Sequence, residues 1–213
     1  MGAGISGVAH YGGSGECEVI FLEKFSLVAV IIAGGAGMLM LTLGNWRRSL
    51  LAFAVQYLAV FWLCSLSLSI GISAIKLITG VMAAILLAGV PSEGEETTER
   101  ASQPGWAFRL LAGLLVWIVM IFLEPAMAAV IPGSPSIRLG GMALIGMGFV
   151  QLGISSRPGR VVLGLLTFLA GFEILYSALE KSVLVMGLLA VVTLGLAFTG
   201  SFLLTAKELG ETP

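Results

Sequence analysis

Residues 161–179 read VVLGLLTFLAGFEILYSAL, and this stretch decides the class of fold. It is apolar over most of its length, and a single carboxylate, Glu173, lies well inside it. A helix needs roughly 20 apolar residues to cross the ~30 Å hydrocarbon core of a bilayer. The stretch therefore predicts a membrane-spanning helix that carries an acid within the membrane.

The whole chain repeats this pattern. Of its 213 residues, 58% are hydrophobic and 11% are charged, whereas soluble domains are about a quarter charged. We therefore predict an all-α, polytopic bundle of about seven transmembrane helices in contact with lipid. The expected spans are residues 25–43, 49–68, 70–90, 106–123, 139–154, 161–179 and 182–206. The net charge of −1 gives no reason to expect a nucleic-acid partner.

Lys and Arg residues in the loops predict the orientation. The side that holds the loops after the first, third and fifth spans, with the C-terminus, is the more basic, through Arg47, Arg48, Arg100, Arg109, Arg157, Arg160 and Lys207. The opposite side has Lys24, Arg138 and Lys181. The positive-inside rule then places the C-terminus in the cytoplasm and the N-terminus outside, for a protein of the cytoplasmic membrane.

Two stretches, NWRRSLLAFAVQYLAVFWLCSL and SRPGRVVLGLLTFLAGFEILYSAL, align without gaps at an offset of 111 residues. This suggests a parallel 3+1+3 repeat, with residues 25–90 and 139–206 as three-span halves and residues 106–123 as a connecting span. Chance similarity between apolar sequences is the alternative. The remaining segments are an extracytoplasmic start (1–24), an acidic cytoplasmic linker (91–105) and a cytoplasmic tail (207–213).

Lys76 and Glu173 are the two ionisable residues that lie deep in the predicted spans. Each is six residues from the outer end of its span, about 9 Å at 1.5 Å per residue. An ion pair between them is therefore geometrically reasonable. Further polar residues of the spans give these two a predicted polar surrounding: Gln56, Ser73, Gln151, Tyr176 and Ser177.

The pair has two interpretations. Low dielectric favours a neutral carboxylic acid and an approaching ammonium favours the carboxylate, so a pair that separates and closes can relay protons. A static structural contact is the other interpretation. The chain has no Asp, and the single His10 and the distant Cys17 (in a predicted loop) and Cys64 give no metal-ligand spacing. We therefore expect no cofactor, no metal and no catalytic residues in a chain that is not an enzyme by itself.

The Gly171-Phe172-Glu173 motif after a basic turn resembles subunit K of respiratory complex I. The whole chain, with Lys76-Leu77-Ile78 in its third span, resembles component E of the hydrogenase-4 family. The resemblance implies a cofactor-free membrane subunit beside antiporter-like subunits of a proton-translocating oxidoreductase complex, with Glu173 as proton carrier. Subunit K has a second glutamate in its last span, and residues 182–206 have none. A stand-alone small-solute or ion transporter and a structural membrane protein are the alternatives.

Overall fold

The computed structural model describes the backbone of residues 14–90, 105–155, 157–180 and 182–210, and the side chains between residues 25 and 206 of these ranges. Its helices are α1 (Ser14–Thr42), α2 (Trp46–Ser65), α3 (Ile70–Ala88), α4 (Trp106–Met127), α5 (Pro135–Ile154), α6 (Pro158–Leu179) and α7 (Val183–Gly210). Within the described ranges, seven helices are long and apolar enough to cross a membrane. The predicted all-α bundle of seven spans is confirmed.

Several helices extend beyond the predicted spans. The first candidate membrane span begins at Phe25 as expected, but its helix already starts at Ser14, so the expectation that Cys17 lies in a loop was wrong. At the other end α7 continues to Gly210, into the predicted tail. Hydropathy detects only the part of a helix that lies in lipid, whereas backbone hydrogen bonding carries a helix on into water. Most of the predicted acidic linker, residues 91–104, and also His10, lie outside the described residues.

α4 and α5 also extend past their predicted ends. α4 includes Glu124 and Pro125 in its last turn, and α5 begins at Pro135 and so includes Arg138. Proline suits the first turn of a helix, where its missing N–H has no partner to lose. Gly133, with φ of 116°, turns the chain into α5 through the left-handed region that favours glycine. The fifth span is therefore a full-length helix.

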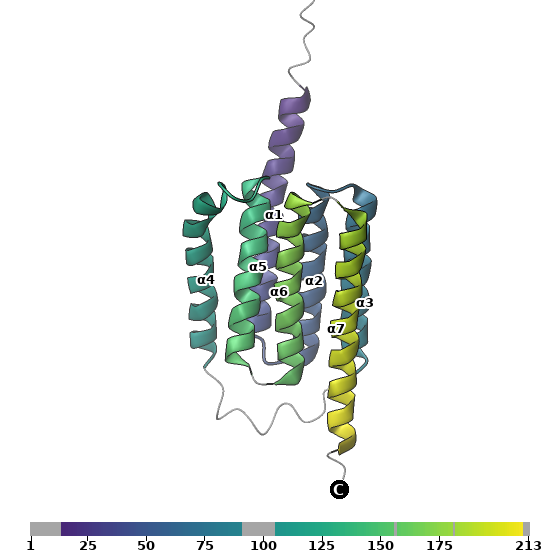
Figure 1. Ribbon diagram of the computed structural model, residues 1–213. Helices are drawn as coiled ribbons and strands as arrows, with labels where there is room; N and C mark the ends of the chain where they lie inside the picture. The colour runs from purple at the N-terminus through teal and green to yellow at the C-terminus, as the bar shows by residue number, and fades with distance from the viewer. Residues whose placement is uncertain (1–13, 91–104, 156, 181, 211–213) are drawn as a thin grey trace, which may run out of the picture.

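The helices form two layers with α4 at one edge (Figure 1). α1, α2 and α3 make one layer, and α5, α6 and α7 make the other. Across the layers α1 packs on α5, α2 on α6 and α3 on α7. Since successive helices alternate in direction, the two members of each of these pairs run the same way.

Two hydrogen bonds join the layers. Ser26 Oγ donates to Ser136 Oγ at 2.7 Å, and Lys76 Nζ donates to the carbonyl of Met186 at 3.3 Å. Both join residues 110 positions apart, close to the offset of 111 in the aligned sequences. The bonded residues thus lie one position from the offset of the aligned sequences, and the parallel repeat itself stays a prediction.

Glycines bring α5 and α6 into backbone contact. A Cβ at Gly171 would lie 2.5 Å from the carbonyl oxygen of Gly141, and a Cβ at Gly148 would lie 2.7 Å from the backbone nitrogen of Phe168. Any larger residue at these positions would force the helices apart. The glycines of α5 and α6 thus allow these two helices to approach closely.

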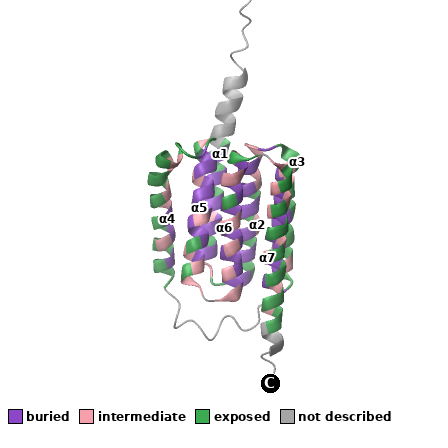
Figure 2. Cartoon of the chain, in the orientation of Figure 1, coloured by how far each residue is buried: buried purple, intermediate pink, exposed green. Residues whose placement is uncertain are grey.

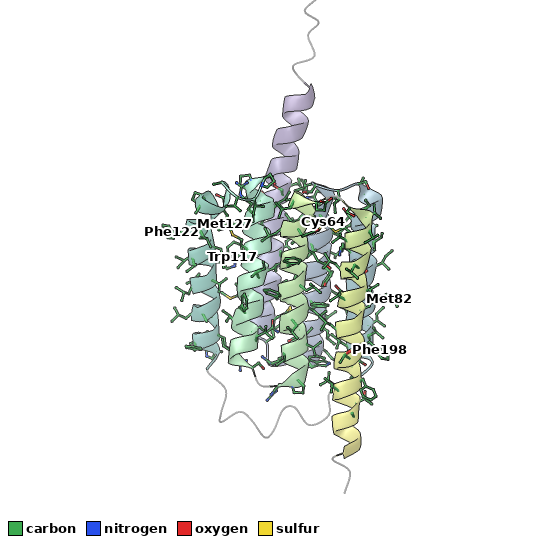
Figure 3. All side chains as sticks on the ribbon, in the orientation of Figure 1. Cys64, Met82, Trp117, Phe122, Met127 and Phe198 are labelled. Carbon is green, nitrogen blue, oxygen red and sulfur yellow. The ribbon has the colours of Figure 1, made fainter. Side chains whose placement is uncertain are left out.

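The outer surface of the bundle is apolar, and the buried residues face between the layers (Figure 2). α4 is the most exposed span, with Phe122 79% exposed. Figure 3 shows Phe122 at the outer edge of α4, and Met82 and Phe198 on the outer side of α3 and α7. Apolar side chains on the outside of the bundle suit a bilayer, because they are as non-polar as the lipid tails that they contact.

The two ends of the bundle differ in charge. We call the end with loops 66–69 and 128–134 the upper face, and the end with loop 43–45 the lower face, as oriented in Figure 1. At the lower face Arg160 donates to the carbonyl of Leu43 at 2.8 Å, and Arg109 donates to that of Leu41. Cations placed on the last carbonyls of a helix complement its dipole, so these arginines stabilise the end of α1.

Candidate functional site

Lys76 on α3 and Glu173 on α6 form an ion pair inside the bundle. Lys76 Nζ lies 2.8 Å from Glu173 Oε1, and each side chain is only 1% exposed. Each residue is six positions from the upper end of its helix, so the pair lies about 9 Å below that end. The structure therefore brings together the two residues that sequence reasoning selected, at the depth it expected.

The third helix of the site, α7, contacts both members of the pair. Thr193 Oγ1 donates to Glu173 Oε1 at 3.3 Å, and the carbonyl of Met186 accepts from Lys76 Nζ at 3.3 Å. Thr193 also reaches the carbonyl of Leu189 at 2.9 Å, so its hydroxyl proton has two acceptors. Sequence reasoning missed Thr193, because a single threonine in an apolar span gives no periodic signal.

The two oxygens of Glu173 are in different surroundings. Oε1 receives both the ammonium and the threonine hydroxyl. Oε2 is fully buried and has no hydrogen-bond partner among the residues that the structure describes. A buried carboxylate oxygen normally has a partner, protein or water. Oε2 is therefore the oxygen that is free to bind a proton or a water molecule.

The predicted supporting residues divide into two groups. Gln56, Ser73 and Ser177 are fully buried, and Ser177 donates to the carbonyl of Ile174 on its own helix. Tyr176 is half-buried, and its ring stacks on Phe172, which is 41% exposed. Tyr176 is thus more exposed than the other three, and its role at the ion pair stays a prediction.

Tyr57 is a buried neighbour that the predicted site did not include. Its side chain is 1% exposed, and its ring fills the space beside Gly80, where no Cβ would fit. Gly80 lies one helical turn from Lys76 on α3. Tyrosines in membrane proteins commonly lie at the membrane interface. This tendency does not predict that Tyr57 packs inside the bundle.

A second ion pair lies at the upper face. Arg138 Nη2 lies 2.5 Å from Glu124 Oε1, and Arg138 also donates to the carbonyl of Gly133 at 2.6 Å. Both charged residues lie one position outside the predicted spans, because a charge lowers the local hydropathy and so appears to end a span. In the structure the charges neutralise each other, so both helices extend to include them.

A cavity of about 740 Å³ lies between α2 and α3 at the lower face, lined by Trp46, Arg47, Leu51 and Ile85 among others. Leu51 and Ile85 are 68% and 59% exposed, so the cavity opens to the outside of the bundle. It is at the opposite end of α3 from Lys76. Within the described residues, no three His, Cys, Asp or Glu side chains come together in a way that could hold a metal.

Comparison of the chain with protein-family models, with curated proteins and with solved structures found no match.

Proposed function

We propose that this integral membrane protein is a subunit of a complex-I-like or membrane-hydrogenase assembly, and that Glu173 carries protons in it with Lys76 as its charge partner. The observation that carries the proposal is the buried Lys76–Glu173 contact of 2.8 Å, with Oε2 of the acid unpartnered in the described chain. Single charges inside a bilayer cost about 2.5–3.5 kcal/mol on insertion scales, so they are rare and mostly functional.

The contact supports a loading and release cycle. The lysine has two acceptors, Glu173 Oε1 and the carbonyl of Met186, and its flexible side chain can shift between them. When the ammonium moves away from the carboxylate, Glu173 loses the charge that stabilises its ionised form and takes up a proton. When the ammonium returns, the carboxylate is stabilised again and the proton leaves.

The resemblance to component E and subunit K supports the same role through Gly171-Phe172-Glu173 and Lys76-Leu77-Ile78. The second glutamate of subunit K has no counterpart in residues 183–206 of α7, where Thr193 is the polar residue that reaches the site. We therefore propose that antiporter-like partner subunits complete the proton route. On the same proposal the upper face is extracytoplasmic and the lower, arginine-rich face is cytoplasmic.

The test is proton pumping in vesicles by the assembly purified through a tag on this chain. Glu173→Gln should abolish pumping while the subunits still assemble on native gels. Glu124→Gln is a matched control, because it makes the same change in the ion pair at the upper face. Normal pumping by Glu173→Gln, or a tagged chain that purifies without antiporter-like or redox subunits, would refute the proposed function.

A static structural contact is the second candidate, and it is favoured by the contacts of α7 with both members of the pair, through the carbonyl of Met186 and the hydroxyl of Thr193. If this interpretation holds, Glu173→Gln prevents assembly. Replacing both charges, with Lys76→Met and Glu173→Gln together, would then restore assembly and pumping.

A further inference from the structure

The cavity of about 740 Å³ at the lower face is a groove along two neighbouring helices. Leu51 and Ala54 line it from α2, and Val81, Ala84 and Ala88 line it from α3. Positions three and four residues apart lie on one side of a helix, so each helix gives the groove a continuous wall. From Val81 to Ala88 the groove follows α3 for seven residues, about 10 Å.

The groove opens toward lipid. Leu51 and Ile85, on its two walls, are 68% and 59% exposed on the apolar outer surface of the bundle. Apart from Arg47, its lining is apolar, with Trp46, Leu50 and Val90 at the lower end. A hollow of this size is within the range of ligand pockets, about 300–1,000 Å³. Its walls suit an apolar chain that enters from the bilayer.

Arg47 adds one positive charge at the lower end of the groove. It lies in the first turn of α2 and is exposed, and among the described residues it has no ion pair or hydrogen bond. Arg109 and Arg160 at the same face differ, because each donates to a carbonyl at the end of α1. The guanidinium of Arg47 is thus available to a ligand in the groove.

The described surroundings of Arg47 do not neutralise its charge. No acidic residue lines the groove or lies in the first turn of α2. Trp46 is buried, and a Cβ at Gly159 of α6 would lie 2.8 Å from its ring, so packing against α6 fixes this wall. An arginine fork beside an apolar wall matches a phosphate that is attached to an acyl chain, because guanidinium binds phosphate oxygens in pairs.

We infer that the groove binds an anionic phospholipid, with an acyl chain between α2 and α3 and the phosphate on Arg47. Basic pockets between transmembrane helices at the cytoplasmic side bind anionic headgroups in this way. A zwitterionic lipid has a cationic amine beside its phosphate, which the arginine repels, so the site selects a headgroup of net negative charge. The proposed cytoplasmic placement of the lower face agrees, because anionic lipids give the cytoplasmic leaflet its negative surface potential.

The test is thermal unfolding of the purified full chain in uncharged detergent. The chain is titrated with phosphatidylglycerol or with phosphatidylcholine of the same acyl chains. A lipid that binds the folded state raises the melting temperature once its concentration exceeds the dissociation constant. We expect phosphatidylglycerol to give the same rise at about tenfold lower concentration, the scale of one hydrogen bond to a charged group.

Arg47→Gln should remove this tenfold difference, and Arg48→Gln should keep it. Arg48 is the matched control, because it is an exposed neighbour on the same turn of α2 that does not line the groove. Since Arg47 is exposed and unpaired within the described chain, its loss should leave the melting temperature without lipid unchanged. Equal loss of selectivity in the two variants would show only a general attraction of cations to anionic lipid, and would overturn the site.

Filling the groove is a second, independent test. Ala88 is exposed and lines the groove, so Ala88→Phe puts a ring there without displacing a packed side chain. We expect this variant to bind phosphatidylglycerol about tenfold more weakly. Ala107→Phe is the control, because Ala107 is exposed at the lower end of α4, away from the groove. Unchanged lipid binding by Ala88→Phe would overturn the proposed place of the acyl chain.

The outcomes are separate from those of the proton-carrier proposal, because the titrations use this chain alone and pumping uses the assembly. Equal titrations by the two lipids would overturn the anionic site and leave the role of Glu173 untouched. A density map of the assembly gives a further check: a lipid phosphate should lie at Arg47. A helix of a partner subunit in the groove would overturn the lipid as its occupant.

Discussion

Lys76 and Glu173 come from different halves of the chain, and α7 holds both of them, through the carbonyl of Met186 and the hydroxyl of Thr193. The ion pair therefore joins three helices, α3, α6 and α7. Any change of the pair affects the packing of these helices as well as proton transfer. Stability and pumping must consequently be measured together.

Removing one charge should destabilise the protein more than removing both. Breaking a buried pair leaves an uncompensated charge and typically costs about 3–5 kcal/mol, whereas replacing both partners is often nearly neutral. We expect Lys76→Met to lower the free energy of unfolding strongly and the double variant with Glu173→Gln to recover most of it. Thermal unfolding in detergent of the wild type, the two single variants and the double variant measures these differences in stability.

The same double variant separates the two roles of the pair. If Glu173 carries protons, the double variant is stable but does not pump. A stable double variant that pumps normally would assign the pair to structure alone.

Thr193→Val should weaken the site without unfolding the protein. The variant loses one hydrogen bond to a charged group, for which about 1.5–3 kcal/mol is expected. Thr205→Val is the matched control on the same helix, because that hydroxyl bonds to the carbonyl of Ser201 and lies on the outside of the bundle. Equal melting temperatures for the two variants would contradict the hydrogen bond of Thr193 to Glu173.

The spans and the ion pair could be predicted from the sequence because the bilayer imposes strong constraints. Apolar length identifies spanning helices, and two opposite charges at equal depth in such helices have few other ways to be neutralised. These constraints act on each helix separately, so they are readable without knowledge of the packing.

The remaining parts of the site depend on packing between helices. Tyr176 and Ser177 lie three and four residues after Glu173, and either spacing is compatible with the same face. The packing of α6 buries Ser177 fully and leaves Tyr176 half-buried. Which helix faces Glu173 is equally a matter of packing, and for this reason Thr193 could not be predicted.

Gly171→Ala should destabilise the contact of α5 with α6. Its Cβ would lie 2.5 Å from the carbonyl oxygen of Gly141, and backbone cannot move aside as a flexible side chain can. Overpacking of this kind costs about 1–3 kcal/mol. Gly187→Ala on α7 is the control, because no atom lies within 4 Å of the added methyl group. Its melting temperature should stay unchanged or rise, and a drop equal to that of Gly171→Ala would argue against the glycine contact.

Arg138→Gln should loosen the upper face. The arginine neutralises Glu124 and holds the carbonyl of Gly133, so its loss leaves a carboxylate and a carbonyl without their partner, at about 1–3 kcal/mol. We expect faster hydrogen exchange in residues 128–134 and unchanged exchange at the lower face. Uniform exchange rates in both loops would show that Arg138 does not hold this turn.

The proposed orientation predicts which loops a membrane-impermeant thiol reagent reaches in intact cells. Pro132 is exposed in the upper face and Asn45 is exposed in the lower face. In a Cys17→Ser background, Pro132→Cys should be labelled from outside, and Asn45→Cys only after the membrane is opened. Cys64 is 0% exposed and should stay unlabelled in both cases. The reverse pattern would place the arginine-rich face outside, against the positive-inside rule, and Glu173 would then lie near the cytoplasm.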